Sequence, residues 1–174
     1  DAESGHPVAR KQKLMFATSQ AFYNTPVRWP GDLRQDYPAG HATIDVDGNN
    51  VTTNAEGEFS WNGTKATVLS AISGPFVSVI NDAGSAASAG FPITDGNSFI
   101  WSEPTIEFTD AQITAFVHAN RAKDYVRPWN PGLTWLNQTM PVTVNIEGSC
   151  NAASNGDGLF FLVEGLGCSN TARL

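Results

Sequence analysis

Histidine and cysteine are the residue types in this chain best suited to bind a metal or act as a nucleophile, and both are scarce. The histidines are His6, His41 and His118. Zinc peptidases place two histidines at positions i and i+4 of a helix, so that both rings reach one ion, with a glutamate between them as base. No two histidines here have that spacing. The sequence therefore predicts neither a metal site nor a catalytic residue in this chain, and His118 is interpreted as a packing or hydrogen-bonding residue.

The two cysteines, Cys150 and Cys168, close a loop of hairpin size near the end of the sequence. We interpret them as a disulfide, which would place the protein in an oxidising, secreted or extracellular setting. Such a bridge contributes about 3 kcal/mol if its effect is to reduce the loop entropy of the unfolded chain. Two free, buried thiols are the alternative.

Acidic residues form two further candidates, neither of which we interpret as a functional site. The run Asp45-Val46-Asp47-Gly48-Asn49 is acidic enough for calcium, but its glycine is in the fourth position and not in the sixth, as in an EF-hand loop. A hairpin turn explains that run without an ion. Glu103 and Glu107 resemble the carboxylate pair of a glycosidase, yet nothing places them in a cleft, so we expect them to be solvated.

The elements that must position these residues are mostly strands. Of the 174 residues, 41% are hydrophobic and only 16% are charged, a profile typical of β-rich extracellular proteins. Ile44 and Val46 alternate with acidic residues, and a turn then leads to Val51, which predicts a hairpin. Further short strands separated by turns follow as far as residue 104. They predict an antiparallel β-sandwich-like module, with an extended lead-in, over residues 1–104.

One helix and two strands are predicted after this module. Thr109 and Gln112 fit a capping box, and Ile113 and Phe116 begin an apolar stripe that Tyr125 would rejoin. Pro128 would end the helix, and strands over residues 142–147 and 159–164 would form a β-hairpin. The predicted fold class is therefore mainly β with one principal helix (α+β), in which residues 105–174 form a second unit.

Charge and hydropathy exclude two classes of partner. The formal net charge is −7, and the basic residues are mostly scattered, whereas phosphate binding requires concentrated Lys and Arg. No apolar run approaches the length of a membrane span. We expect neither nucleic acid nor a membrane as a partner.

The second unit resembles a known family in the order of its motifs. The helix contains HANRAKDYV (118–126), and PVTVNI (141–146), Cys150, an Asn-Ala pair, an NGDG turn (155–158), LFFLVEG (159–165) and GCSNTA (167–172) follow. This order is similar to the run that precedes the HExxH zinc helix in secreted thermolysin-like and fungalysin-like metallopeptidases. The resemblance covers residues 99–174, and the HExxH motif is absent from the sequence. It implies that residues 105–174 are the incomplete amino-terminal part of a metallopeptidase catalytic lobe.

The resemblance also implies roles for two residues. In thermolysin-like enzymes an edge strand carrying Asn-Ala lies alongside the substrate, so Asn151 and Ala152 are the expected substrate-binding residues. Ala153 departs from the pattern, because the family usually has Phe or Tyr there. Zinc is expected in the intact parent enzyme and not in this chain, which alone would be inactive. The expected partners are a peptide substrate and the remaining catalytic fragment.

A second hypothesis is a non-catalytic extracellular binding or adhesion module that recognises carbohydrate or protein. Its candidate contacts are the five tryptophans Trp29, Trp61, Trp101, Trp129 and Trp135. Most of them are expected to lie in the core. A reading frame that continues past Leu174 into HExxH would favour the peptidase fragment over the binding module.

Overall fold

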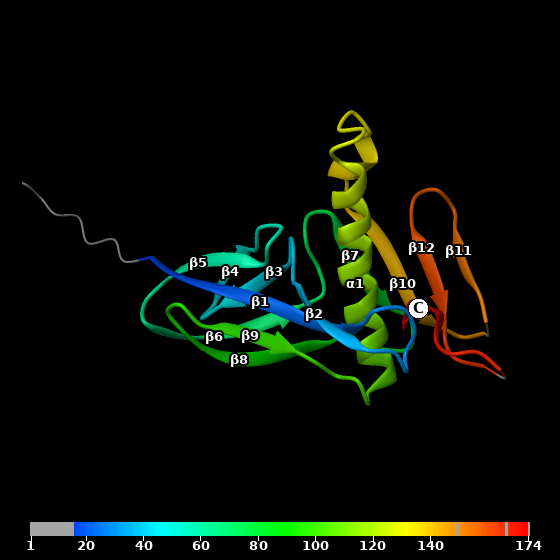
Figure 1. The fold of residues 1–174 in the computed structure, drawn as a ribbon, viewed down its shortest axis with the longest axis horizontal. Helices are drawn as coiled ribbons and strands as arrows, with labels where there is room; N and C mark the ends of the chain where they lie inside the picture. Colours follow the sequence, from blue (N-terminus) through cyan, green and yellow to red (C-terminus); the bar gives the residue numbers. More distant parts are fainter. Residues whose placement is uncertain (1–15, 149, 166, 174) are drawn as a thin grey trace, which may run out of the picture.

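The fold is mainly β with one principal helix (α+β), which confirms the predicted class. The structure is a computed structural model that describes residues 16–148, 150–165 and 167–173. Its strands form three four-stranded sheets. In Figure 1 most strands that precede the long helix lie to its left, and the last two strands lie to its right. The strands are β1 (Phe16–Pro26), β2 (Arg34–Pro38), β3 (Thr43–Val46), β4 (Asn49–Thr52), β5 (Glu58–Asn62), β6 (Lys65–Ala71), β7 (Val77–Asn81), β8 (Ser88–Thr94), β9 (Ser98–Trp101), β10 (Met140–Ile146), β11 (Ala152–Ser154) and β12 (Leu159–Leu162). The helices are α1 (Glu107–Val126) and the short 3-10 helices η1 (Thr134–Asn137) and η2 (Thr171–Arg173).

The first sheet is organised around β1, which has 11 residues. The first half of β1 pairs with β5 and its second half with β2, both antiparallel, while β9 pairs with its middle in parallel. Buried and more exposed residues alternate along β1, as expected when one face of a sheet covers a core. Part of the predicted extended lead-in is thus the strand β1, while residues 1–15 lie outside the described residues.

The second sheet has the strand order β4-β3-β6-β8 and contains the predicted hairpin. Ile44 on β3 pairs with Val51 on β4 in antiparallel register. Asp47 and Gly48 at the turn both have positive φ angles, 49° and 86°. Such angles are typical of a type I′ hairpin turn and are easiest for Gly, Asn and Asp. The Asp45 carboxylate accepts a hydrogen bond from the backbone N–H of Gly48 at 2.7 Å, so this acid closes the turn.

The third sheet, β11-β12-β10-β7, combines strands from both halves of the chain. β10 pairs with β7 and with β12, in both cases in parallel. The two strands predicted after the helix are therefore neighbours, but they do not form a hairpin with each other. The hairpin is made by β11 and β12, because the short β11 after Cys150 turns back along β12.

Helix α1 begins at Glu107, two residues before the predicted cap. A turn at Glu103–Ile106 already leads the chain into helical geometry, and no side chain caps the first turn. The predicted capping box at Thr109 and Gln112 is therefore wrong. The Gln112 amide instead donates to the Phe108 carbonyl and accepts from the backbone N–H of Ala87.

The far end of α1 follows the prediction in part. The helix ends at Val126, two residues before Pro128. Tyr125 does not rejoin the apolar stripe, since 74% of its surface is exposed. This last turn and the loop after it extend beyond the sheets in Figure 1, so no core lies beside Tyr125 for it to join.

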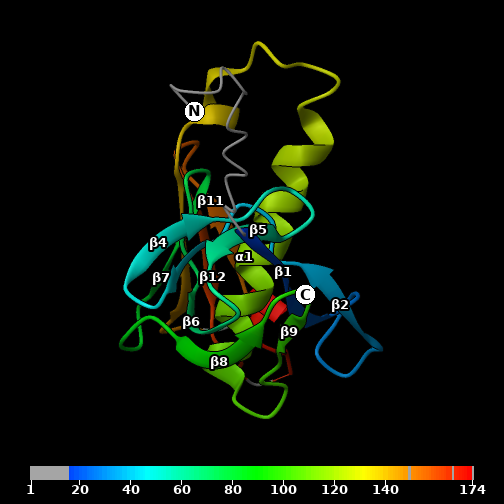
Figure 2. The ribbon, with the colours of Figure 1, turned by 90° about the vertical axis from the view of Figure 1, so that its left-hand side faces the viewer.

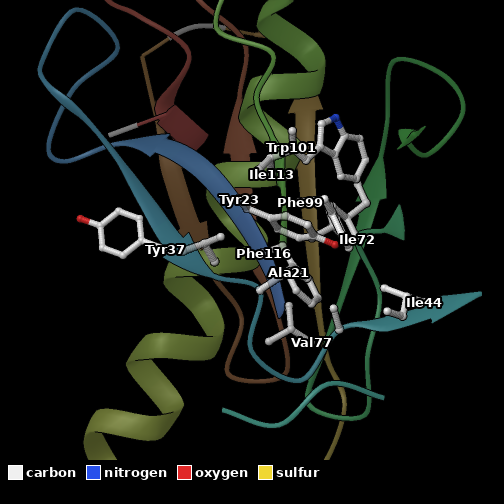
Figure 3. Close-up of a cluster of buried hydrophobic side chains, with 14 of the residues drawn as sticks. Ala21, Tyr23, Tyr37, Ile44, Ile72, Val77, Phe99, Trp101, Ile113 and Phe116 are labelled. Carbon is white, nitrogen blue, oxygen red and sulfur yellow. The ribbon is translucent and has the colours of Figure 1, made fainter. Parts of the chain in front are cut away.

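The core extends from α1, between the first and third sheets, to the second sheet, whose Ile44, Val68 and Ile93 are buried in the same cluster. In Figure 2, α1 stands between β1, β2 and β9 on one side and β7, β12 and β11 on the other. Figure 3 shows Tyr23 of β1, Trp101 of β9 and Phe116 of α1 together in this core. The Tyr23 and Trp101 rings meet edge to face at 5.5 Å, an arrangement that stabilises aromatic pairs by about 0.5–1.5 kcal/mol beyond burial alone. Trp61 and Trp101 are buried, whereas Trp29, Trp129 and Trp135 are exposed, so the expectation that most tryptophans lie in the core is wrong.

Candidate functional site

Strand β11, which carries the predicted substrate-binding Ala152, is one of the two edge strands of its sheet among the described residues. Its three residues are all exposed, and its partner in the described part of the chain is β12. In Figure 1 it forms one margin of the molecule. An edge strand offers a row of unpaired backbone N–H and C=O groups, with which another extended chain can pair.

The register of the β11–β12 hairpin shows which residues offer those groups. The backbone N–H of Leu162 donates to the Asn151 carbonyl at 3.2 Å. Hydrogen-bonded and non-hydrogen-bonded pairs alternate along an antiparallel ladder, so the Ala153–Phe160 pair is bonded. The pairs of Ala152 with Phe161 and of Ser154 with Leu159 are then not bonded to each other. Ala152 and Ser154 therefore direct their N–H and C=O groups to the free edge.

A disulfide and the hydrogen bonds of Thr171 hold the start of β11 in place. The predicted disulfide is present, with Sγ atoms of Cys150 and Cys168 2.04 Å apart. The hydroxyl of Thr171 lies 2.7 Å from the Asn151 carbonyl and 3.0 Å from the Leu162 carbonyl, and it accepts a hydrogen bond from the Leu162 N–H at 2.9 Å. Asn151 itself is exposed, and its side-chain amide has no hydrogen-bond partner among the described residues. That amide is available to a ligand at the edge.

The far end of β11 is closed by a turn that its own side chains organise. The Asn155 side-chain oxygen accepts hydrogen bonds from the backbone N–H groups of Asp157 and Gly158, and Ser154 accepts one from Gly156. Asn favours such turns because its side chain hydrogen-bonds the backbone two residues further on, and Gly favours them because it adopts positive φ angles without a steric cost. This NGDG turn sets the hairpin register that turns Ala152 and Ser154 outward.

Two buried asparagines, Asn145 of β10 and Asn170, link β10 to the last described residues of the chain. Asn145 has a positive φ of 59° and sits where the register of β10 with β12 shifts. Its amide donates to Asn81 and to the Phe108 carbonyl, and its oxygen accepts from Asn170 at 2.9 Å. Asn170 also donates to Glu107 at 3.0 Å. Glu107 is thus a structural partner and not one of two free acids.

A buried ion cluster holds the chain around Arg173 against α1. Asp110 has no exposed surface, and its carboxylate binds Arg34 at 2.6 Å and Arg173 at 2.8 Å. Arg34 comes from β2 and also donates to the Asn24 carbonyl. The sequence did not predict this cluster. Its sequence signal is weak, since no local pattern links positions 34, 110 and 173.

The described histidines are in separate places and have structural contacts. His41 lies 3.1 Å from the Asp124 carboxylate, and its ring packs against Phe76. His118 contacts Thr25 and packs edge-on against Tyr37, as its predicted packing role requires; His6 lies outside the described residues. Within residues 16–148, 150–165 and 167–173 no three His, Cys, Asp or Glu side chains are grouped so that they could hold a metal ion. The described residues therefore do not fit a zinc site.

Comparisons with known proteins add no identification: no protein-family model matches the chain, and no curated protein matches it significantly. Among the described residues, no helix is long and apolar enough to span a membrane.

Proposed function

We propose that this chain is part of a secreted, zinc-dependent endopeptidase of the thermolysin-like superfamily, to which it contributes the edge that pairs with the substrate. One observation supports this proposal most directly. The Asn-Ala pair lies at the start of an exposed edge strand that a disulfide and Thr171 fasten in place. The order of motifs shared with fungalysin-like enzymes supports it as well.

In this proposal the substrate is an extended peptide that adds a strand beside β11. Its backbone pairs with the outward N–H and C=O groups of Ala152 and Ser154, while the amide of Asn151 binds a further main-chain group. The small side chain of Ala153 leaves the flank of this edge open, where the family usually has an aromatic ring.

The zinc and its HExxH ligands belong to the rest of the enzyme in this proposal. When bound, the zinc would activate the water that attacks the peptide carbonyl. The disulfide is consistent with an oxidising compartment, which supports secretion. We expect the 174-residue chain alone to bind no stoichiometric zinc and to leave casein intact. Casein hydrolysis that a chelator abolishes would overturn this expectation.

Peptide pairing can be tested on the chain itself. A short acetylated peptide, Gly-Val-Thr-Val-Gly amide, is titrated into the isotopically labelled protein, and backbone amide shifts are followed by NMR. We expect saturable shifts at Ala152 and Ser154, and slower hydrogen exchange at both amides. Ala152→Pro removes an outward N–H without removing a bond to β12 and should abolish binding. Ala152→Ser keeps that N–H and should bind normally.

The outcome is decisive because the two variants differ in one backbone donor. If neither amide shifts, or if Ala152→Pro binds as well as the native chain, β11 is not a pairing edge. Asn151→Ala should weaken binding by about fivefold, the effect of one hydrogen bond.

A further inference from the structure

A polar cleft of about 680 Å³ opens on the outer face of the first sheet. Three neighbouring strands form its floor. There Gln20 of β1 lies between its register partners, Ser98 of β9 and Glu58 of β5. Thr18 and Ser60 form the next pair of β1 and β5 on this face. These side chains face away from the core, because their strand neighbours are the buried ones.

Two loops form the walls of this cleft and hold its amide side chains in place. Asn54, from the β4–β5 loop, accepts from the backbone N–H of Glu58 at 2.8 Å and donates to the Glu58 carboxylate at 3.0 Å. Asn97, from the β8–β9 turn, donates to Thr94 at 2.6 Å. Gln20 donates to the Glu56 carbonyl at 2.6 Å. The amides are therefore fixed before any ligand arrives, which lowers the entropy lost on binding.

Ser19 at the cleft is hydrogen-bonded to Thr94 and Trp61, but several other polar groups there have no partner among the described residues. Among the described residues, the hydroxyls of Thr18, Ser60 and Ser98 make no hydrogen bond, and neither does the side-chain oxygen of Gln20. A hydroxyl can donate and accept at once, and an amide oxygen can accept twice. Glu58 is the one ionisable side chain among the described residues that line the cleft.

We propose that this cleft binds a neutral oligosaccharide. Sugar hydroxyls, like those of Thr18 and Ser60, both donate and accept hydrogen bonds, so the hydroxyls of a sugar can pair with those of the cleft. An anionic ligand is disfavoured because the lining holds no Lys or Arg. An added peptide strand is disfavoured beside Gln20, because β1 is paired there with β5 on one side and with β9 on the other.

Recognition in this cleft rests on hydrogen bonds and not on stacking. The exposed tryptophans, Trp29 and Trp129 among them, do not line it. Each hydrogen bond exchanged with water contributes little net free energy, so we expect millimolar affinity. This proposal does not rest on the peptidase proposal, since the cleft and β11 are on different sheets.

The test uses the whole chain and three soluble probes: cellohexaose, xylohexaose and chitohexaose. Each is titrated to millimolar concentration into the isotopically labelled protein, and backbone amide shifts are mapped. At least one sugar should produce saturable shifts that are confined to Thr18, Gln20, Ser60, Ser98 and their neighbours. The double variant Thr18→Ala/Ser60→Ala should bind that sugar about tenfold more weakly or worse. Thr67→Ala, an exposed threonine of β6, is the matched control and should bind normally.

Both substituted side chains of the double variant are without protein partners among the described residues, so its far-UV circular dichroism should equal that of the native chain. The proposal is overturned if no probe gives saturable shifts, or if the shifts map to another surface such as that around Trp129. It is also overturned if the double variant binds within about twofold of the native chain.

Discussion

The imidazole of His118 is half-buried between α1 and the first sheet. Its Nε2 lies 3.4 Å from the Thr25 hydroxyl, and its ring meets that of Tyr37 edge-on. Burial lowers the pKa of His118 below its usual value, and the nearby Arg121 guanidinium lowers this pKa further. A hydrogen bond to the backbone of Pro26 opposes both effects in part. The folded state therefore favours the neutral form of the His118 ring.

This lowered pKa predicts an acid-sensitive contribution to stability. Above the usual histidine pKa of about 6.5, both folded and unfolded chains hold the ring neutral. As the pH falls, the unfolded chain takes up the proton first, so stability is lost as the pH falls through the folded-state pKa. Urea denaturation at neutral pH and about pH 5 should show a smaller loss for His118→Gln than for the native chain. Equal losses in the two proteins would contradict the prediction.

Asp110 carries a buried charge that two cations balance. Its carboxylate is fully buried and binds two guanidiniums, those of Arg34 and Arg173. Asp110→Asn keeps the shape but leaves both cations without a counter-charge. Removing one partner of a buried ion pair typically costs about 3–5 kcal/mol. Chemical denaturation should show a loss of that size.

Glu56→Gln is the control for this substitution, because Glu56 is exposed and its carboxylate has no partner among the described residues. It should change the free energy of unfolding by less than about 0.5 kcal/mol. If Asp110→Asn changes the free energy of unfolding as little as Glu56→Gln does, the cluster does not stabilise the end of the chain.

At the scale of elements, the disulfide determines how firmly β11 is held. This strand pairs with β12 over three residues only, and its start is fastened by Cys150 and the Thr171 hydroxyl. The double variant Cys150→Ser/Cys168→Ser should lose about 3 kcal/mol of stability in the loop-entropy description. Hydrogen exchange should also accelerate at the Leu162 amide, while amides in the middle of α1 keep their protection. Unchanged exchange at Leu162 would show that the bridge does not fasten the hairpin.

Strand positions could be predicted from the sequence better than strand neighbours could. Alternation located β3 and β4, because residues that alternate between core and solvent must alternate in polarity. Alternation specifies a face and not a partner, so it could not show that β10 and β12 run in parallel. The helix start was missed because the turn at Glu103–Ile106, and not a polar cap, begins α1.

The candidate site was predictable only where its signals are local. The spacing of Cys150 and Cys168 predicted the disulfide, and the Asn-Ala pair lies at the start of an edge strand. The outward turn of Ala152 and Ser154 depends on the hairpin register. The anchoring of Arg173 on Asp110 joins positions 63 residues apart. Contacts over such distances leave no pattern in a single sequence.

At the scale of the whole molecule, the contacts predict that the two halves of the chain fold together. β7, from residues 77–81, pairs with β10 over five residues, from Met140 with Val77 to Val144 with Asn81. Helix α1 packs against both β1 and β7, and the Phe116 ring lies 6.0 Å from that of Tyr23. Residues 105–174 alone would expose the faces of α1 and β10 that this contact buries, so we expect that fragment to be unfolded.

The full chain should therefore unfold in one cooperative transition. Fluorescence of the buried Trp61 and Trp101 reports on the amino-terminal half, and the hydrogen exchange of α1 amides reports on the other. The two probes should give the same midpoint in urea, because neither half retains its core without the other. Separate midpoints, or a folded 105–174 fragment with the helical circular dichroism of α1, would show instead that the boundary near residue 104 divides two independent units. A shared midpoint would mean that a peptide bound at β11 stabilises the whole chain, since ligands that bind only the folded state shift its entire unfolding equilibrium.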